Sequence, residues 1–266
     1  MTILITRPLA AAKRTEHTFQ AAGLSTWIDP VLTIIPLPSH INPAAFDAII
    51  TTSANGVESF AALTQHRDVP IFCAGNASAA IAHELGFTSI FYPKKPGGNE
   101  LITLIKQVFN LNPIALSSPK PPCLSSPCLT RGSKPENNHL DARIKSGHDM
   151  TGSVKRFAYI RGEVVKIDIA KALGDTNANV DTYITYKTIP TSAWTDETLN
   201  LFHNRKITAI TFYSEHSAHV TLDLLRAHNL LGCTPSITAL CLSEAISDVL
   251  KDFVWQAIKT EPSGNF

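Results

Sequence analysis

The sequence lacks a surplus of charge of either sign. Lysine and arginine together number 23 and aspartate and glutamate 22, which leaves a formal net charge of +1 at pH 7. A general nucleic-acid binder needs clustered basic residues that neutralise phosphates. The balance excludes that class, and we expect no nucleic-acid partner.

Long apolar runs are also missing. No stretch approaches the roughly 18 to 20 consecutive apolar residues that cross a bilayer as a helix. The first residues, Met1–Pro8, show no charged segment followed by an apolar one, and Arg7 interrupts the apolar run. We therefore expect a cytoplasmic protein with no membrane partner.

Cysteine is too sparse and scattered for a disulfide framework. The chain has five cysteines, an odd number, so reduced thiols are expected. Cys123 and Cys128, together with His139 and His148, would be a conceivable zinc site, but their spacing matches no compact ligand pattern. We predict no bound metal.

Several motifs of common chemistry are absent as well. The sequence contains no G-x-G-x-x-G, G-x-x-x-x-G-K-[ST], H-E-x-x-H or G-x-S-x-G. Dinucleotide binding, phosphoryl transfer, zinc hydrolysis and the α/β-hydrolase triad therefore lack support.

The sequence does contain an internal repeat. The apolar runs Thr2–Pro8 and Phe157–Gly162 both end on an arginine-containing turn, and each precedes a segment with helical spacing. Each copy then continues into a β-branched run that ends on Ile-Pro, namely Leu32–Pro36 and Tyr186–Pro190. Both copies therefore begin as strand, helix, strand.

The second part of each copy repeats too. Phe46–Gly56 matches Ile207–His216, and Ile71–Ala80 matches Ala239–Asp248: each is an apolar run followed by small polar residues and a helical pattern. Strands that alternate with helices of 10 to 15 residues indicate an α/β fold with a parallel sheet. A chain of 266 residues has room for two such domains of about 100 to 150 residues.

Residues 112–152 belong to neither copy. This stretch contains six prolines and many serines and has no apolar period, a composition that cannot offset the entropy of ordering. We predict a disordered insertion at about 112–152.

Polar residues gather where the predicted strands lead into helices. In parallel sheets ligands bind beyond the carboxyl ends of strands, and small residues there leave backbone amides and hydroxyls for anions. A serine at such a turn is also the ordinary cap of a helix, so both interpretations stay open. The clusters are Thr6-Arg7, Thr52–Gly56, Gly75–Ser78, Arg161-Gly162 and Tyr213-Ser214.

An ordered set of phrases resembles the uroporphyrinogen-III synthases of tetrapyrrole biosynthesis. The phrases are Ile5–Pro8, Phe46–Val57, Gly75–Ala79, Tyr159–Gly162 and Thr185–Thr188. The resemblance implies two flavodoxin-like parallel-sheet α/β domains that exchange halves and are joined by a two-stranded hinge. The first domain would combine residues 1–36 with 190–266, the second would span 38–186 and contain the insertion, and the active site would lie between them.

The resemblance also implies a reaction. Such enzymes cyclise hydroxymethylbilane, a linear tetrapyrrole, with inversion of ring D through a spiro intermediate, and they need no cofactor or metal. The family's candidate acid falls on Tyr186, for which packing within a strand is the competing interpretation. The positions implied as substrate-binding are Thr6, Arg7, Ser53, Ala54, Gly75, Ser78, Arg161, Gly162 and Ser214.

Two departures keep alternatives open. The family usually has Thr-Ser-Pro where this chain has Tyr213-Ser214-Glu215, and Ile246 replaces a hydroxyl-bearing residue in Ser243–Ser247. An inactive homologue, or a two-lobed module that binds an anionic small molecule without chemistry, therefore remains an alternative to an active synthase. We expect a monomer.

Overall fold

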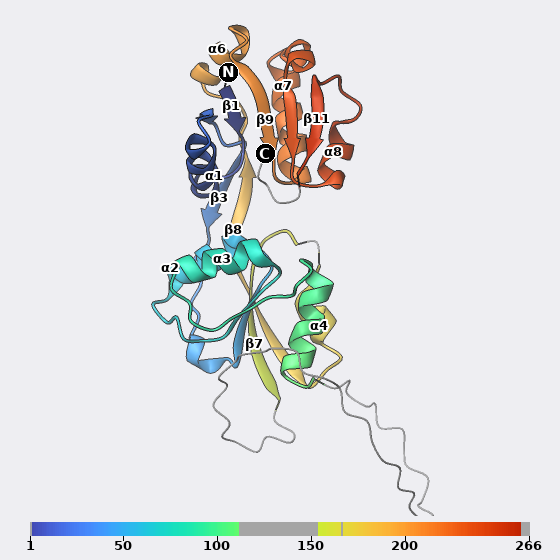
Figure 1. Ribbon diagram of the computed structural model, residues 1–266. Coiled ribbons are helices and arrows are strands. Elements are labelled where there is room, and N and C mark those ends of the chain that lie inside the picture. Colours follow the sequence, from blue (N-terminus) through green and yellow to red (C-terminus); the bar gives the residue numbers. More distant parts are fainter. Residues whose placement is uncertain (1, 112–153, 166, 262–266) are drawn as a thin grey trace, which may run out of the picture. The chain divides into compact units, whose positions relative to one another are not determined.

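The computed structural model describes residues 2–111, 154–165 and 167–261 (Figure 1). The predicted insertion at 112–152, with the conceivable zinc ligands Cys123, Cys128, His139 and His148, lies outside the described residues. The chain packs as two compact units. The first comprises Met1–His40, Arg161–Val165 and Ile184–Phe266, and the second comprises Ile41–Ile160 and Lys166–Tyr183.

The first unit is a five-stranded parallel sheet with the strand order β11-β10-β9-β1-β2. If the strands are counted as β1, β2, β9, β10 and β11, this is the order 2-1-3-4-5 of flavodoxin-like folds. The strands are β1 (Thr2–Ile5), β2 (Ser25–Ile28), β9 (Ile207–Phe212), β10 (Thr238–Cys241) and β11 (Ala257–Thr260). The helices are α1 (Leu9–Ala21), α6 (Asp196–His203), α7 (Glu215–Ala227) and α8 (Glu244–Leu250), with a 3-10 turn at Leu231–Ser236.

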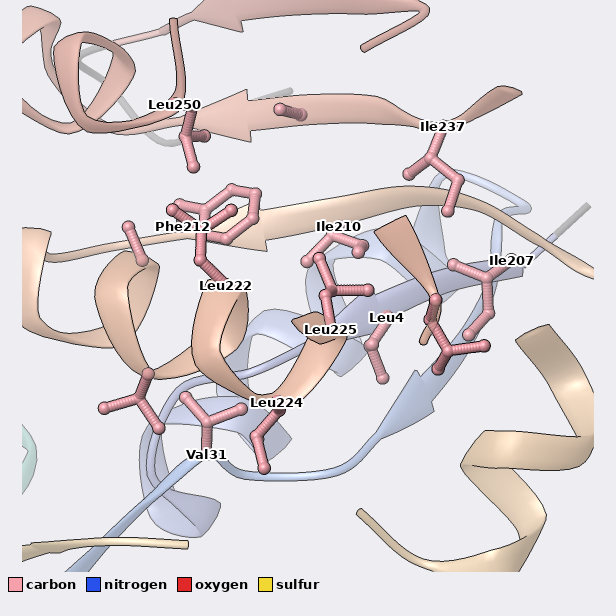
Figure 2. Packing of buried hydrophobic residues seen from close by; sticks show 14 of the residues in the cluster. Leu4, Val31, Ile207, Ile210, Phe212, Leu222, Leu224, Leu225, Ile237 and Leu250 are labelled. Carbon is pink, nitrogen blue, oxygen red and sulfur yellow. The ribbon is translucent and has the colours of Figure 1, made fainter. Parts of the chain in front are cut away.

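Both faces of this sheet are covered, because alternate residues of each strand point to opposite faces. On one face Leu4, Ile210 and Phe212 pack against α7 and α8, and Figure 2 shows Leu222 and Leu225 of α7 beside these strands. On the other face a smaller cluster packs against α1; its buried members are Ile3, Ile5, Ala12, Phe19, Ala209 and Leu240. This two-faced burial explains why the strands read as continuous apolar runs in the sequence.

The second unit repeats the same topology. Its strands lie in the order β8-β7-β4-β5-β6, which is again 2-1-3-4-5 when β7 is counted first. The strands are β4 (Ala48–Thr51), β5 (Ile71–Cys73), β6 (Ile90–Phe91), β7 (Lys155–Gly162) and β8 (Ala178–Pro190). The helices are α2 (Ala54–Leu63), α3 (Asn76–Glu84), α4 (Gly98–Val108) and α5 (Ile169–Leu173), with a 3-10 turn at Pro43–Ala45.

Helices cover both faces of the second sheet as well. Ile49 and Ala158 face the cluster that includes α2 and α3, whereas Ile50 and Tyr159 face the cluster that includes α4 and α5. The start of α2 lies close to the end of β7, because a Cβ atom on Gly56 would lie 3.3 Å from the carbonyl oxygen of Ile160. Glycine at this position therefore lets the helix begin directly against the sheet.

The long strand β8 carries the chain from the second unit into the first. Its carboxyl-terminal part pairs antiparallel with β3 (Leu32–Pro36), in a register that runs from Leu32 opposite Pro190 to Pro36 opposite Tyr186. This is the predicted two-stranded connection. Each unit combines the first part of one copy of the repeat with the second part of the other, so the predicted fold class with exchanged halves is confirmed.

The predicted domain limits of 1–36 with 190–266 and of 38–186 stay a prediction. The packing units differ from them in one respect that affects the site: Arg161–Val165 and residues 184–186, which fall within the predicted second domain, belong to the first unit. The two segments contact each other, because Gly162 packs against the ring of Tyr186 and the N–H of Glu163 donates a bond of 3.1 Å to the Tyr186 carbonyl oxygen.

A buried carboxylate joins β2 to the start of α6 in the first unit. Asp29 is 6% exposed and its Oδ2 atom accepts hydrogen bonds from the backbone N–H and the hydroxyl of Thr195, at 3.0 and 2.9 Å, and from the hydroxyl of Thr198. Thr198 also accepts a bond of 2.8 Å from the indole Nε1 of Trp27. A negative charge at a helix amino terminus is favourable, so one carboxylate satisfies three donors and complements the dipole of α6.

We predict that Asp29→Ala lowers the free energy of unfolding of the first unit by about 3 kcal/mol, because it leaves buried donors without an acceptor. Urea unfolding followed by tryptophan fluorescence measures this directly, since Trp27, Trp194 and Trp255 all lie in the first unit. The matched control is Asp223→Ala, which removes an exposed ion pair with Arg226 and should cost at most about 1 kcal/mol. Equal unfolding midpoints for the two variants would contradict the prediction.

Candidate active site

Each sheet has one place where ligand binding is expected from topology alone. In the first unit β1 and β9 are neighbours, but β1 connects through α1 to β2 on one side and β9 connects through α7 to β10 on the other. Ligands of such sheets bind at the carboxyl ends of the strands at this switch point. We call the ends of β1 and β9 the first switch point; Thr6-Arg7 and Tyr213-Ser214 lie there.

Thr6 has a role in the framework of the first switch point. Its side chain is fully buried, its hydroxyl donates a bond of 2.7 Å to the carbonyl oxygen of Thr211, and its own carbonyl oxygen accepts from the N–H of Val31 at 3.0 Å. The first bond joins the ends of β1 and β9, and the second joins the end of β1 to the segment that follows β2. The implied contact of Thr6 with substrate stays a prediction, but the geometry favours a structural role for its hydroxyl.

Arg7 lies beside Tyr213 at the same switch point. Its guanidinium carbon is 3.9 Å from the centroid of the Tyr213 ring, and its Nη1 donates a bond of 3.0 Å to the hydroxyl of Thr15 on α1. The resemblance implied Arg7 as substrate-binding, but it did not indicate the aromatic ring beside which the guanidinium lies. Nothing in the local pattern marks this contact, because its two residues come from opposite ends of the sequence.

Ser214 caps helix α7. Its hydroxyl accepts from the N–H of Ser217 at 3.1 Å, and the Ser217 hydroxyl accepts from the N–H of Ser214 at 3.2 Å, so the two form a reciprocal capping box. Ser214 is exposed and its predicted contact with substrate stays open. The neighbouring Glu215 begins the helix, where a carboxylate complements the helix dipole.

The departure at Ile246 has a packing explanation. Ile246 on α8 is buried in the main core cluster of the first unit, together with Leu250 and Phe212. The position that bears a hydroxyl in the family pattern is therefore filled here by a core side chain. It gives no hydrogen-bond donor to a ligand.

Four predicted residues lie in the second unit, at the ends of the adjacent strands β4 and β5. Ser53 caps α2 and accepts from the N–H of Gly56 at 3.0 Å, and Ala54 is the first residue of that helix. Gly75 precedes α3, where a Cβ atom would lie 2.9 Å from the Cβ of Pro96, and the buried Ser78 hydroxyl bonds the Gly75 carbonyl oxygen at 3.5 Å. Two helix amino termini thus begin side by side on parallel strands.

Tyr186 and Gly162 contact each other in the first unit. The side chain of Tyr186 is 8% exposed, and a Cβ atom on Gly162 would lie 2.7 Å from its ring atoms Cε2 and Cζ and 3.0 Å from its hydroxyl oxygen. The N–H of Glu163 donates a bond of 3.1 Å to the Tyr186 carbonyl oxygen. Only glycine at position 162 leaves room for the phenol ring of Tyr186, which packs directly against it.

Arg161 braces the same turn. Its Nη1 donates to the carbonyl oxygens of Gly162 and Glu163, at 3.3 and 3.1 Å, and its Nε is buried without a hydrogen bond to the described residues. The resemblance implied that Arg161 and Gly162 bind substrate. The substrate contacts stay predictions, whereas the bracing contacts are present.

Two thiols lie next to these strand ends but are unsuited to covalent chemistry. Cys73 ends β5 and Cys241 ends β10, and burial raises the pKa of each to about 12; for Cys241 the nearby Glu244 adds to the shift. A thiol with so high a pKa is almost entirely protonated at neutral pH and therefore a poor nucleophile.

Other features of the described residues add no second site. Across residues 2–111, 154–165 and 167–261 no three histidine, cysteine or acidic side chains gather as metal ligands would, and no helix among them is long and apolar enough to span a bilayer. An open hollow of about 200 Å³ lies at the amino ends of β4 and β5, near Pro43, Phe46 and His66. That edge of the sheet is opposite the one at which Ser53 and Gly75 lie.

Two flavodoxin-like units that exchange halves, with polar groups at the carboxyl ends of their strands, define a class of two-domain α/β proteins. The family model described as "Uroporphyrinogen-III synthase HemD" matches residues 13–117 and 138–263. The chain belongs to the uroporphyrinogen-III synthase family, whose members are cyclising lyases of haem biosynthesis. The resemblance inferred from the sequence is thereby confirmed.

A solved structure supports the fold. The uroporphyrinogen-III synthetase of Helicobacter pylori is 13% identical with a TM-score of 0.53, and the match covers 99% of this chain and 95% of that one. A mutant uroporphyrinogen III synthase of Thermus thermophilus is 11% identical with a TM-score of 0.45, over 97% and 92% of the two chains. Comparison with curated protein sequences gives no significant match.

We predict that Gly162→Ala lowers turnover of hydroxymethylbilane by about 10²-fold with little change in KM, because the added methyl group displaces the Tyr186 ring and a shift near 1 Å costs about that much. The matched control is Gly232→Ala, since a Cβ atom there has no neighbour within 4 Å. Steady-state kinetics measure kcat and KM of both variants, and urea unfolding checks that both are folded. Full turnover by Gly162→Ala would show that Gly162 does not fix the phenol.

Proposed function

We propose that this chain is an active uroporphyrinogen-III synthase, which cyclises hydroxymethylbilane with inversion of ring D. The observation that carries the proposal is the family match, which extends over both copies of the repeat and leaves out only residues 118–137 within its span. Tyr186 adds support, because its ring packs against Gly162 and its phenol is a proton donor in a fixed position at the end of the two-stranded connection.

The reaction begins when one proton is donated to the hydroxyl oxygen of ring A. Tyr186 donates its phenolic proton to the hydroxyl on the ring A methylene, which leaves as water and generates an azafulvene cation. The substituted carbon of ring D attacks that methylene and forms the spiro intermediate. Fragmentation and reclosure at the free carbon, with loss of a proton, give the inverted ring D. General acid catalysis of this kind is worth about 10² to 10⁴, and the remaining acceleration comes from holding the ends of the chain together.

Individual hydrogen-bond donors and charged groups, and not the net charge of the chain, have to bind the substrate. The whole chain carries a formal charge of +1, so bulk attraction contributes little to holding eight carboxylates. The amino termini of α2, α3 and α7, with hydroxyls of Ser53 and Ser214 and the guanidinium groups of Arg7 and Arg161, supply the positive potential and the donors in this proposal. The family acts on a tetrapyrrole, and we extend that substrate class to this chain.

The cytoplasmic location and monomeric state expected from the sequence form part of the proposal. Cell fractionation tests the first, and light scattering on the purified chain tests the second.

The decisive experiment incubates the purified chain with hydroxymethylbilane, oxidises the products and resolves the uroporphyrin isomers by chromatography. We expect the type III isomer in excess over the type I isomer that forms spontaneously. If only type I appears, at the spontaneous rate, the chain is the inactive homologue or binding module, and a titration with uroporphyrin III tells these two apart.

We predict that Tyr186→Phe lowers kcat by about 10² to 10⁴, with KM and the affinity for uroporphyrin III unchanged, because only the donated proton is lost. The matched control is Tyr183→Phe, the same substitution three residues earlier on β8, where the ring packs edge-on against Phe46 at 6.1 Å. Wild-type turnover by Tyr186→Phe would remove Tyr186 from the acid role.

A further inference from the structure

Arg161 folds its side chain back onto the two residues that follow it in the sequence. Its Nη1 atom donates to the carbonyl oxygen of Gly162 at 3.3 Å and to that of Glu163 at 3.1 Å, and the arginine is half-buried. These three residues belong to the first unit, as does Tyr186. The guanidinium therefore holds two successive carbonyl groups at the end of β7, in the unit that contains the candidate acid.

One peptide group connects Arg161 with Tyr186. The carbonyl oxygen of the peptide group between Gly162 and Glu163 accepts from Arg161, and the N–H of the same group donates a bond of 3.1 Å to the carbonyl oxygen of Tyr186. Because a peptide group is planar, a rotation of its plane changes both bonds together. Hydrogen bonds in such a chain also polarise one another. The orientation of this plane therefore couples the arginine to the backbone of Tyr186.

The ring of Tyr186 contacts the same turn. A Cβ atom on Gly162 would lie 2.7 Å from the ring atoms Cε2 and Cζ, so the glycine lies directly against the phenol. A displaced turn would either press on this ring or leave space beside it. By holding the turn, Arg161 supports the backbone contact and the ring contact of Tyr186 together.

The guanidinium of Arg161 has little capacity left for a substrate carboxylate. Arginine binds a carboxylate most strongly with two parallel N–H bonds from two of its nitrogen atoms. Nη1 already serves two carbonyl oxygens, and Nε is buried without a hydrogen bond to the described residues. Only Nη2 is then left for a substrate oxygen, although the charge still adds to the positive potential of the site. The geometry favours support of the turn over two-bond binding of a carboxylate.

We propose that Arg161 is a positioning residue, which holds the turn of Gly162 and Glu163 and thereby keeps the phenol of Tyr186 in place for proton donation. This inference rests on the proposed function. It differs from the role that the resemblance implies for Arg161, because the arginine then acts through Tyr186 and not through a contact with substrate.

The test is Arg161→Met in the full-length chain, which keeps an unbranched side chain and removes every donor. With hydroxymethylbilane as substrate, kcat should fall about 10- to 10²-fold and KM should stay within about twofold, because a misplaced acid affects the transition state and not substrate binding. Arg161→Lys retains donors for the two carbonyl oxygens and should recover most of the turnover. The matched control is Arg156→Met on the same strand, which breaks an exposed ion pair with Asp181 at 3.1 Å and should change neither constant.

A double variant separates positioning from a direct role in binding. Adding Arg161→Met to Tyr186→Phe should lower kcat no further, because the phenolic proton that the arginine helps to place is already absent. A raised KM with unchanged kcat for Arg161→Met overturns the proposal, since that pattern indicates lost ground-state binding of substrate. Independent, multiplied losses in the double variant overturn it as well.

Amide hydrogen exchange tests the turn without the reaction. The N–H of Glu163 should exchange about tenfold faster in Arg161→Met than in the wild type or in Arg156→Met, because its peptide plane has lost a supporting bond. An unchanged exchange rate contradicts the positioning role. If the wild type makes only the type I isomer, the proposed function fails, yet the exchange rates still decide whether Arg161 holds the turn against Tyr186. Arg161→Leu repeats each measurement if the methionine variant does not fold.

Discussion

The central strand pairing of each sheet is the constraint on which the rest of the structure depends. In the first unit β1 pairs with β9, and the hydroxyl of Thr6 bonds the carbonyl oxygen of Thr211, a residue 205 positions away. In the second unit β4 pairs with β7 across the segment that lies outside the described residues. Each sheet is therefore closed at its centre by contacts of long range, and its switch point forms only when both halves of the chain have met. Such pairings are entropically costly and slow to form, so folding should depend on the two halves finding each other.

Much of the fold could be predicted from the sequence, because the internal repeat indicates which segments form corresponding strands and helices. Both copies end their first part on Ile-Pro, and these phrases become the antiparallel pair of β3 with β8. Continuous apolar runs such as Ala48–Thr51 predicted strands covered on both faces, which the alternation of Ile49 and Ile50 between two core clusters explains. The exact unit limits were less accessible. Arg161–Val165 belong with the first unit, where Gly162 and Glu163 contact Tyr186, and no local sequence pattern indicates these contacts.

The candidate site was predictable in position but not in detail. Every cluster of small polar residues does lie at the carboxyl end of a strand, because parallel topology puts all such turns at one edge. What each side chain does there depends on partners far away in the sequence. Ser53 and Ser214 cap helices, and Thr6 forms a hydrogen bond between two strands. Gly162 leaves the space that the ring of Tyr186 occupies. The ring beneath Arg7 was missed because Tyr213 is separated from it by most of the chain.

The exchange of halves has a consequence for how such a chain can arise. One copy of the repeat alone, with β1 to β6, holds two strands of the five-stranded sheet and four strands of the six-stranded sheet, so it completes neither. Two identical single copies that traded their second parts would complete both sheets and would carry their Ile-Pro strands side by side in antiparallel pairing, as β3 and β8 do here. The present chain has the topology of a domain-swapped dimer whose two subunits have been fused into one polypeptide. Fusion then allows the two copies to differ. After β1 the guanidinium of Arg7 lies on the ring of Tyr213, whereas at the end of β7 Arg161 braces the turn and Gly162 packs against the ring of Tyr186.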